Sequence, residues 1–124
     1  WSSKADIPEG SVYHLPALLA DEMVNAPTVI LVYSAASGVA ASSTFPGVQN
    51  LLLSARALGL GTVLTTLHPE VMERVNAMFG VPEDMAFHCC IPLGYPRGNF
   101  GPTSRLPTSE TTSWDRWGQS PPWK

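Results

Sequence analysis

Two adjacent threonines, Thr65 and Thr66, and a solitary arginine, Arg105, are the residues whose types suit the binding of a polar ligand. The threonines end the stretch "GLGTVLTT", which follows a predicted helix and contains two glycines. Such groups bind but do not catalyse alone, so the pattern is typical of proteins in which a bound cofactor carries the chemistry. The plain alternative is a helix end followed by a β-branched strand, and the spacing alone leaves both interpretations open.

The sequence patterns of self-sufficient catalytic sites are absent. The chain has no G-x-S-x-G elbow, no P-loop and no paired-carboxylate signature. "GLGTVL" begins like a dinucleotide fingerprint, but it lacks the third glycine and runs from helix to strand, the reverse of the required order. The histidines share no metal-ligand spacing and are interpreted as structural: His14, His68 and His88. We therefore predict no metal site and no catalytic side chain.

The two cysteines, Cys89 and Cys90, are neighbours in the sequence. In a strand their side chains point to opposite faces, so they cannot easily form a disulfide. We interpret them as small buried residues of a core strand, in a reducing, cytoplasmic setting.

The composition limits the classes of partner. A chain of 124 residues with 44% hydrophobic residues is sufficient for one globular domain. Charged residues amount to only 14%, against about 25% in an ordinary domain, so we expect part of the surface to be buried against another chain. A net charge of -3 without a basic stripe argues against nucleic acid. Polar residues and Pro27 interrupt the longest apolar tract, 26–41, which argues against a membrane span.

The periodicity predicts the elements that position these residues. A short helix carries Leu15, Leu18, Leu19 and Met23 and ends before Pro27. The β-branched run 28–34 predicts a central strand that is covered on both faces. A second helix is expected to begin at Ser42, Ser43 or Thr44, with Pro46 in its first turn, and to end near Leu58, where Gly59 closes it.

The remaining core elements follow the second helix. "TVLTT" predicts a short extended piece, and a third helix begins at Pro69 and stops at Gly80. "FHCCIPLGY", 87–95, predicts another buried strand. From Pro96 to Lys124 prolines and glycines prevent regular structure, yet aromatic residues are costly to leave in water. We therefore divide the chain into a domain, 1–95, and an extended arm, 96–124, that packs on the core or on a partner subunit.

Three segments together carry a resemblance to a known family. "VQNLLLSARALGLGTVLTTLHPE", "LGYPRGNFGPTSRLP" and "WDRWG" occur in the same order and at similar separations as in the carboxy-terminal half of the FMN-dependent nitroreductase family. The resemblance implies an α+β fold with a central sheet flanked by helices and an extended carboxy-terminal arm. The family's amino-terminal phosphate-binding segment has no counterpart before Trp1, so the chain looks like an incomplete domain.

The resemblance also implies a cofactor, its ligands and a reaction. Leu64, Thr65, Thr66 and Leu67 match the segment that lines the flavin ring, and Arg105 matches the arginine that pairs with the FMN phosphate. The lysine that many relatives carry two residues earlier is replaced by Thr103. The implied reaction passes hydride from NAD(P)H through FMN to a nitroaromatic, quinone or similar acceptor.

The family implies a homodimer with flavin at the interface and carboxy-terminal arms that wrap over the partner subunit. Two alternatives remain open. One is a reductive dehalogenase or a reductase of activated alkenes with the same fold. The other is a non-catalytic dimerisation module whose flavin site has decayed, and this alternative is motivated by the missing amino-terminal segment and by Thr103.

Overall fold

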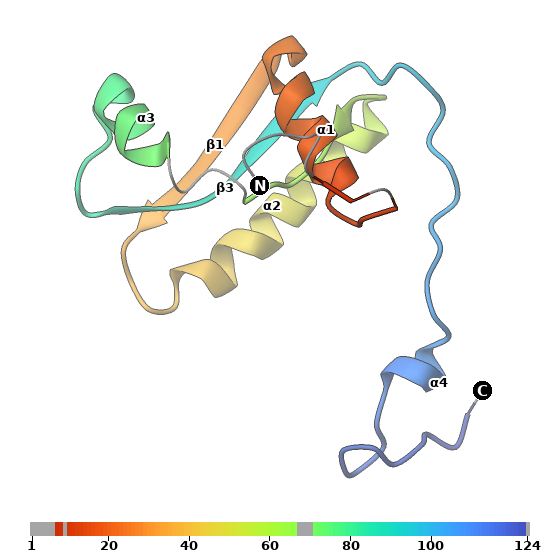
Figure 1. Ribbon diagram of the computed structural model, residues 1–124. Helices are drawn as coiled ribbons and strands as arrows, with labels where there is room; N and C mark the ends of the chain where they lie inside the picture. Colours follow the sequence, from red (N-terminus) through yellow and green to blue (C-terminus); the bar gives the residue numbers. More distant parts are fainter. Residues whose placement is uncertain (1–6, 9, 67–70, 124) are drawn as a thin grey trace.

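Strand β3 (Met85–Gly94) is the centre of the protein's sheet. The computed structural model describes residues 7–8, 10–66 and 71–123. Its elements in chain order are α1 (His14–Glu22), η2 (Met23–Asn25), β1 (Thr28–Ala35), α2 (Ala40–Ala57), β2 (Gly61–Thr62), α3 (Met72–Phe79), β3 and α4 (Thr108–Thr111). This combination of helices and a small antiparallel sheet confirms the predicted α+β class (Figure 1).

The three described strands are ordered β1-β3-β2 and all pair antiparallel. The prediction that 28–34 is the central strand is wrong for the described part of the chain, because β1 lies at the edge and β3 lies between its neighbours. A continuous apolar run indicates that both faces of a strand are covered. It does not indicate whether a neighbouring strand pairs with each of its two hydrogen-bonding edges. The predicted strand 87–95 is confirmed, and its residues Cys89, Cys90 and Ile91 are buried.

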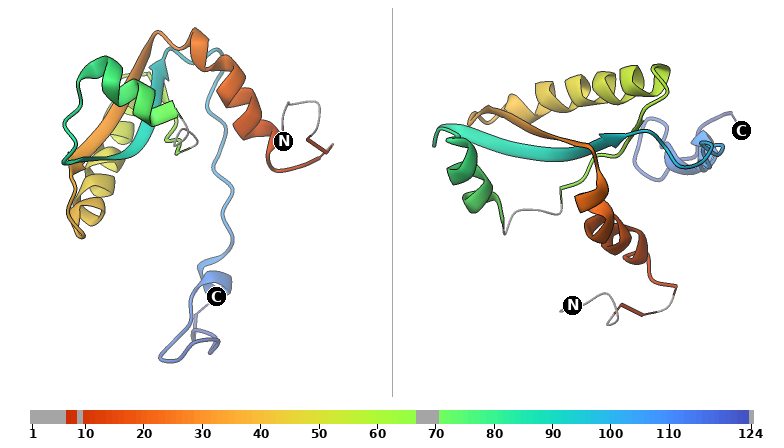
Figure 2. Two further views of the ribbon diagram at one scale, coloured as in Figure 1. Left: turned by 60° about the vertical axis from the view of Figure 1, so that its left-hand side comes forward. Right: turned by 90° about the horizontal axis from the view of Figure 1, so that it is seen from above.

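Helices lie on both faces of this sheet, with α2 on one side and α3 on the other (Figure 2). Cys89 and Ile91 pack with Val48 of α2 in the main hydrophobic cluster. Cys90 points to the opposite face and lines a cavity of about 250 Å³ beneath α3. The opposite positions of the two side chains confirm the prediction that neighbouring cysteines of a strand point apart, and both thiols are free.

A β-bulge interrupts the pairing of β1 with β3. The register shifts between Val32 and Tyr33, so that His88 has no direct partner across the ladder. Instead, the Nε2 atom of His88 lies 2.6 Å from the hydroxyl oxygen of Ser34. The Tyr33 hydroxyl donates a hydrogen bond of 2.8 Å to the side-chain carbonyl oxygen of Asn76 and thereby ties α3 to the sheet.

Helix α2 begins earlier than predicted. It starts at Ala40, so Pro46 lies inside the helix and not in its first turn. The hydroxyls of Ser42 and Thr44 do not cap the helix; they donate to the carbonyls of Val39 and Ala40, at 2.6 and 2.8 Å. Hydroxyls near a helix start accept from later amides or donate to earlier carbonyls, and the sequence alone does not distinguish these two arrangements.

The end of α2 is as predicted. Gly59 adopts a left-handed conformation with φ 77°. The amide of Leu60 donates to the Ala55 carbonyl at 2.9 Å, and the amide of Gly59 donates to the Arg56 carbonyl at 3.1 Å. These two bonds form a Schellman motif, which turns the chain from α2 directly into β2. Helix α3 also ends at a left-handed glycine, Gly80, whereas its predicted start at Pro69 lies outside the described residues.

The carboxy-terminal arm leaves the sheet and extends away from it (Figure 1). Near its root, the ring of Phe100 lies 3.7 Å beneath the guanidinium of Arg56 on α2. Further along, Trp114 and Trp123 pack edge to face on one another, with their ring centroids 5.2 Å apart, while Trp117 is 99% exposed. The arm thus carries apolar rings with little cover, and its division from the domain at residue 95 stays a prediction.

Candidate functional site

Thr65 is held in place by the central strand. Its amide donates to the Cys90 carbonyl and its carbonyl accepts from the Cys90 amide, both at 2.9 Å. Thr65 is 5% exposed, Leu64 packs against the hydrophobic cluster under α2, and Thr66 is exposed. The three residues therefore form a short extension of β2 along the edge of the sheet.

This extension presents main-chain groups to its open side. In an antiparallel ladder, a residue that exchanges both hydrogen bonds with its partner alternates with residues whose amides and carbonyls point the other way. Because Thr65 exchanges both bonds with Cys90, the main-chain groups of Leu64 and Thr66 point away from β3. The edge thus offers donors and acceptors that a ligand can bind.

A pocket of about 440 Å³ lies between this edge and helix α1. Residues 63–66 form one wall, and Leu15, Pro16 and Leu19 of α1 form the other. The lining is apolar except for the two threonines, which is the usual composition of a small-molecule site: apolar walls with a few placed polar groups.

The structure brings together part of the predicted site. Leu64, Thr65 and Thr66 line one pocket, while Leu67 lies outside the described residues. Arg105 is exposed, is not among the residues that line the pocket, and belongs to the arm that leads away from the sheet (Figure 1). Its predicted place beside the other site residues is therefore not seen within this one chain.

Sequence reasoning did not assign the wall that α1 contributes. The apolar spacing of Leu15 and Leu19 predicted the helix but did not indicate what it packs against. The signal appears only in the structure, where Leu15 is 76% and Leu18 is 45% exposed, far more than expected for the apolar face of a core helix.

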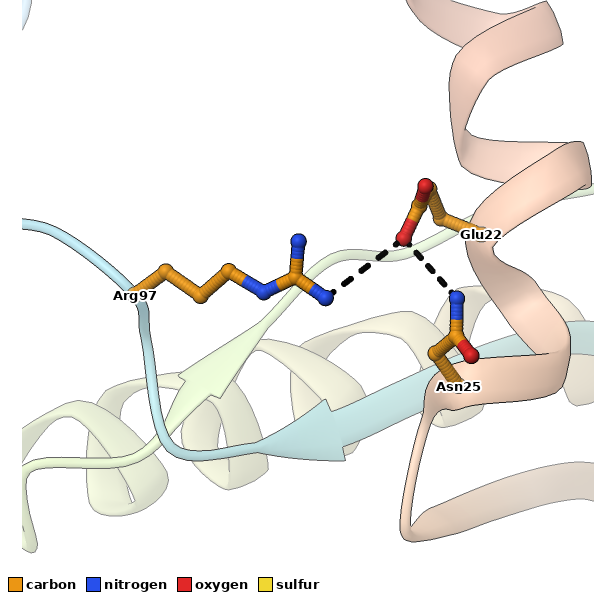
Figure 3. A network of polar contacts seen from close by, with 3 residues as sticks. All are labelled: Glu22, Asn25 and Arg97. Carbon is orange, nitrogen blue, oxygen red and sulfur yellow. Dashed lines mark hydrogen bonds and ion pairs between the residues drawn. The ribbon is translucent and has the colours of Figure 1, made fainter.

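A second and larger cavity adjoins the first. It has a volume of about 560 Å³ and shares Leu19 and Val63 with the first pocket. At its rim, the guanidinium of Arg97 lies 3.7 Å from a carboxylate oxygen of Glu22, and the Asn25 amide donates to the same oxygen at 2.9 Å (Figure 3). This rim joins the end of α1 and η2 to the root of the arm.

The cysteine thiols and the possible metal ligands show no arrangement typical of catalysis among the described residues. Burial raises the pKa of the Cys89 and Cys90 thiols, and the neighbouring Cys89 raises that of Cys90 further, so neither is an activated nucleophile. Among the described residues, no group of three His, Cys, Asp or Glu side chains is arranged to hold a metal ion. None of the described helices is long and apolar enough to cross a membrane.

Comparison with known proteins finds a family that matches most of the chain. The model of the Nitroreductase family matches residues 3–95. Two curated relatives carry the name "Putative NADH dehydrogenase/NAD(P)H nitroreductase". The relative from Methanothermobacter thermautotrophicus is 44% identical over 55 residues, and the relative from Archaeoglobus fulgidus is 37% identical over 51 residues. These matches cover 43% and 40% of this chain and 29% of either relative.

Solved structures show the same fold. A protein of the same name from Bacteroides thetaiotaomicron superposes with a TM-score of 0.64 at 26% identity, over 78% of this chain and 66% of the other. An iodotyrosine deiodinase bound to FMN and 3-iodo-L-tyrosine superposes with a TM-score of 0.60 at 21% identity, over 94% of this chain and 62% of the other. This chain therefore spans about two thirds of the length of these structures.

Proposed function

Because this chain belongs to the nitroreductase family, we propose that it functions in an FMN-dependent oxidoreductase that uses NAD(P)H to reduce a nitroaromatic, a quinone or a similar acceptor. The names of the curated relatives support the coarser statement, an oxidoreductase. The more specific proposal, an enzyme that uses FMN, is supported by the pocket between α1 and residues 64–66. There the predicted flavin-binding residues meet apolar walls.

The pocket is suited to the ring end of FMN. A flat aromatic ring system with polar atoms along one edge requires apolar walls and a few main-chain donors, and the pocket offers both at Leu64 and Thr66. The phosphate end of FMN also requires positive charge, and none of the described residues that line this pocket is positively charged. We propose that Arg105 supplies that charge from the arm, in the homodimer that the family resemblance implies.

When bound, FMN would supply the centre that accepts hydride from NAD(P)H and passes it on. The protein's share is positioning and electrostatics. Main-chain amides at Leu64 and Thr66 would donate to the ring edge and stabilise negative charge there, which tunes the potential. Leu15 and Leu19 would keep water from the ring, so that these hydrogen bonds act in a less polar medium.

A homodimer with flavin at its interface is part of this proposal. The rings of the arm support it, since Trp117 is almost fully exposed and Phe100 is 43% exposed in the single chain. Aromatic surface of this kind is costly in water and is enriched at protein interfaces. A cytoplasmic location likewise stays a proposal, consistent with the two free thiols.

Reductive dehalogenation is a second candidate activity. One observation favours it: the deiodinase structure bound to FMN and 3-iodo-L-tyrosine covers 94% of this chain. At 21% identity this likeness shows the fold alone, so we rank dehalogenation below nitro or quinone reduction.

Titration of FMN, followed by quenching of flavin fluorescence, tests the proposed function. The purified chain should be compared with a version that includes any upstream residues its gene encodes. Saturable quenching in either form, accompanied by NAD(P)H oxidation, would support the proposal. A dimer that quenches no flavin in either form would instead support the non-catalytic dimerisation module.

Replacement of Arg105 by alanine tests the phosphate contact. We expect the dissociation constant of FMN to rise roughly 10- to 100-fold, because a charge-assisted hydrogen bond contributes about 1.5–3 kcal/mol. The affinity for riboflavin, which lacks the phosphate, should not change. Arg116→Ala, at another exposed arginine of the arm, is the matched control. An FMN dissociation constant equal to that of the parent chain would remove Arg105 from the site.

A further inference from the structure

The cavity beside the proposed flavin pocket has no role so far. At about 560 Å³ it falls within the size range of small-molecule sites. It adjoins the proposed flavin pocket, since Leu19 and Val63 line both. A molecule held there would lie next to whatever occupies the first pocket, as a compound that exchanges electrons with a cofactor must.

The walls of this cavity select for an apolar, aromatic body. Leu18 and Leu19 of α1, Leu93 at the end of β3, and Phe100 at the root of the arm contribute apolar side chains. The position of Phe100 is fixed by the guanidinium of Arg56, 3.7 Å from its ring centroid. Aromatic rings pack favourably against such walls.

The arginine at the rim, Arg97, favours an anionic substituent. Arg97 carries the cationic side chain of the lining, and its guanidinium has five donors. Its one described ion pair, with Glu22, is long at 3.7 Å, and the side chain of Arg97 is 87% exposed. Such a pair is weak, so the guanidinium remains able to bind a ligand carboxylate in a forked arrangement.

Glu22 would compete with that ligand. The Asn25 amide donates to Glu22 at 2.9 Å and holds its carboxylate at the rim, where its charge both attracts Arg97 and repels an incoming anion (Figure 3). The rim therefore contains one group that favours an anion and one that opposes it, and the two can be altered separately.

From this geometry we propose that the cavity binds the electron acceptor and that Arg97 makes it selective for aromatic acceptors with a carboxylate. This inference rests on the proposed function, because it places the acceptor beside the flavin pocket. With 4-nitrobenzoate as probe, the overall step converts the nitro compound, NAD(P)H and one proton to the nitroso compound, NAD(P)⁺ and water. NAD(P)H supplies two electrons and one hydrogen as hydride, the proton supplies the second hydrogen, and one oxygen atom of the nitro group leaves as water.

Calorimetric titration of the flavin-free protein with 4-nitrobenzoate and with 4-nitrobenzamide tests the proposal. The two probes have nearly the same shape and differ in charge. We expect Arg97→Gln to raise the dissociation constant of the benzoate about tenfold, the loss of one charge-assisted contact, and to leave that of the benzamide unchanged. Arg74→Gln, at an exposed arginine on α3 outside the cavity, should change neither.

Glu22→Gln should act in the opposite direction. Removing the competing carboxylate frees Arg97 and should lower the dissociation constant of 4-nitrobenzoate about threefold, an effect that weakens as salt screens the charges. In the flavin-loaded protein, the ratio of kcat/KM for the two probes should follow the same order across the variants.

The result that overturns this inference is distinct from failure of the proposed function. If the protein binds FMN and reduces both probes, but Arg97→Gln does not change their ratio, the acceptor site lies elsewhere. Absence of benzoate binding to the flavin-free protein would overturn it as well. If benzoate binds in an Arg97-dependent manner while no FMN binds, the anion site stands and the flavin proposal fails.

Discussion

Truncation of Ile91 to alanine should lower the free energy of unfolding by about 2–5 kcal/mol. Ile91 is fully buried in the middle of β3, where it packs with Val48 of α2 and with Cys89. Deleting three carbons there removes apolar burial and leaves a cavity that the central strand cannot easily close, because β3 is paired on both sides. Urea unfolding followed by circular dichroism measures the change.

Val24→Ala is the matched control, because Val24 lies in η2 and is 86% exposed. Its change should stay within about 0.5 kcal/mol, as for surface substitutions in general. An Ile91→Ala effect of similar size would mean that the interface of α2 with β3 is not the stabilising core. It would also undermine the site, because Leu64 packs on this same cluster.

The features that were predicted correctly are those set by local chemistry. Gly59 and Gly80 end helices in left-handed conformations, which only a residue without a Cβ adopts at little cost. The strand at 85–94 was predicted at 87–95 from a mostly apolar segment, and the opposite orientation of the two cysteines follows from the alternation of side chains in a strand. In each case the physical cause lies within a few residues of the feature.

The features that were missed depend on distant parts of the chain. The position of β1 at the sheet edge depends on which strands pair, and its composition reports only burial. The start of α2 depends on whether Ser42 donates or accepts, a choice made by the surrounding fold. The α1 wall of the proposed flavin pocket depends on how two elements more than forty residues apart in sequence approach each other.

The candidate site also combines features set by local chemistry with features that depend on distant parts of the chain. The position of residues 64–66 beside the sheet follows directly from the helix end at Gly59, and their role in flavin binding stays a prediction from the resemblance. Arg105 could be identified by resemblance alone, and a single chain does not bring it to the pocket. The proposed contact of Arg105 with FMN would depend on a second subunit, and the local sequence carries no signal of such a contact.

Replacement of Thr65 by proline should uncouple the proposed flavin-binding edge from the sheet. Proline has no amide hydrogen, so the 2.9 Å bond to the buried Cys90 carbonyl is lost, and its ring disfavours the paired position. We expect the amide of Cys90 to exchange with solvent faster, and the protein to lose about 1–3 kcal/mol of stability for the unsatisfied carbonyl. Hydrogen exchange read by mass spectrometry measures the first effect without any cofactor.

Thr65→Val separates the two contributions of this residue to flavin binding, because valine keeps the main-chain pairing with Cys90 and removes only the hydroxyl. If the edge positions its main-chain donors by this pairing, Thr65→Pro should raise the dissociation constant of FMN tenfold or more, and Thr65→Val should have a much smaller effect. Equal losses in the two variants would assign the binding to the hydroxyl. Normal FMN affinity in Thr65→Pro, together with fast exchange at Cys90, would show that the flavin does not bind at this edge.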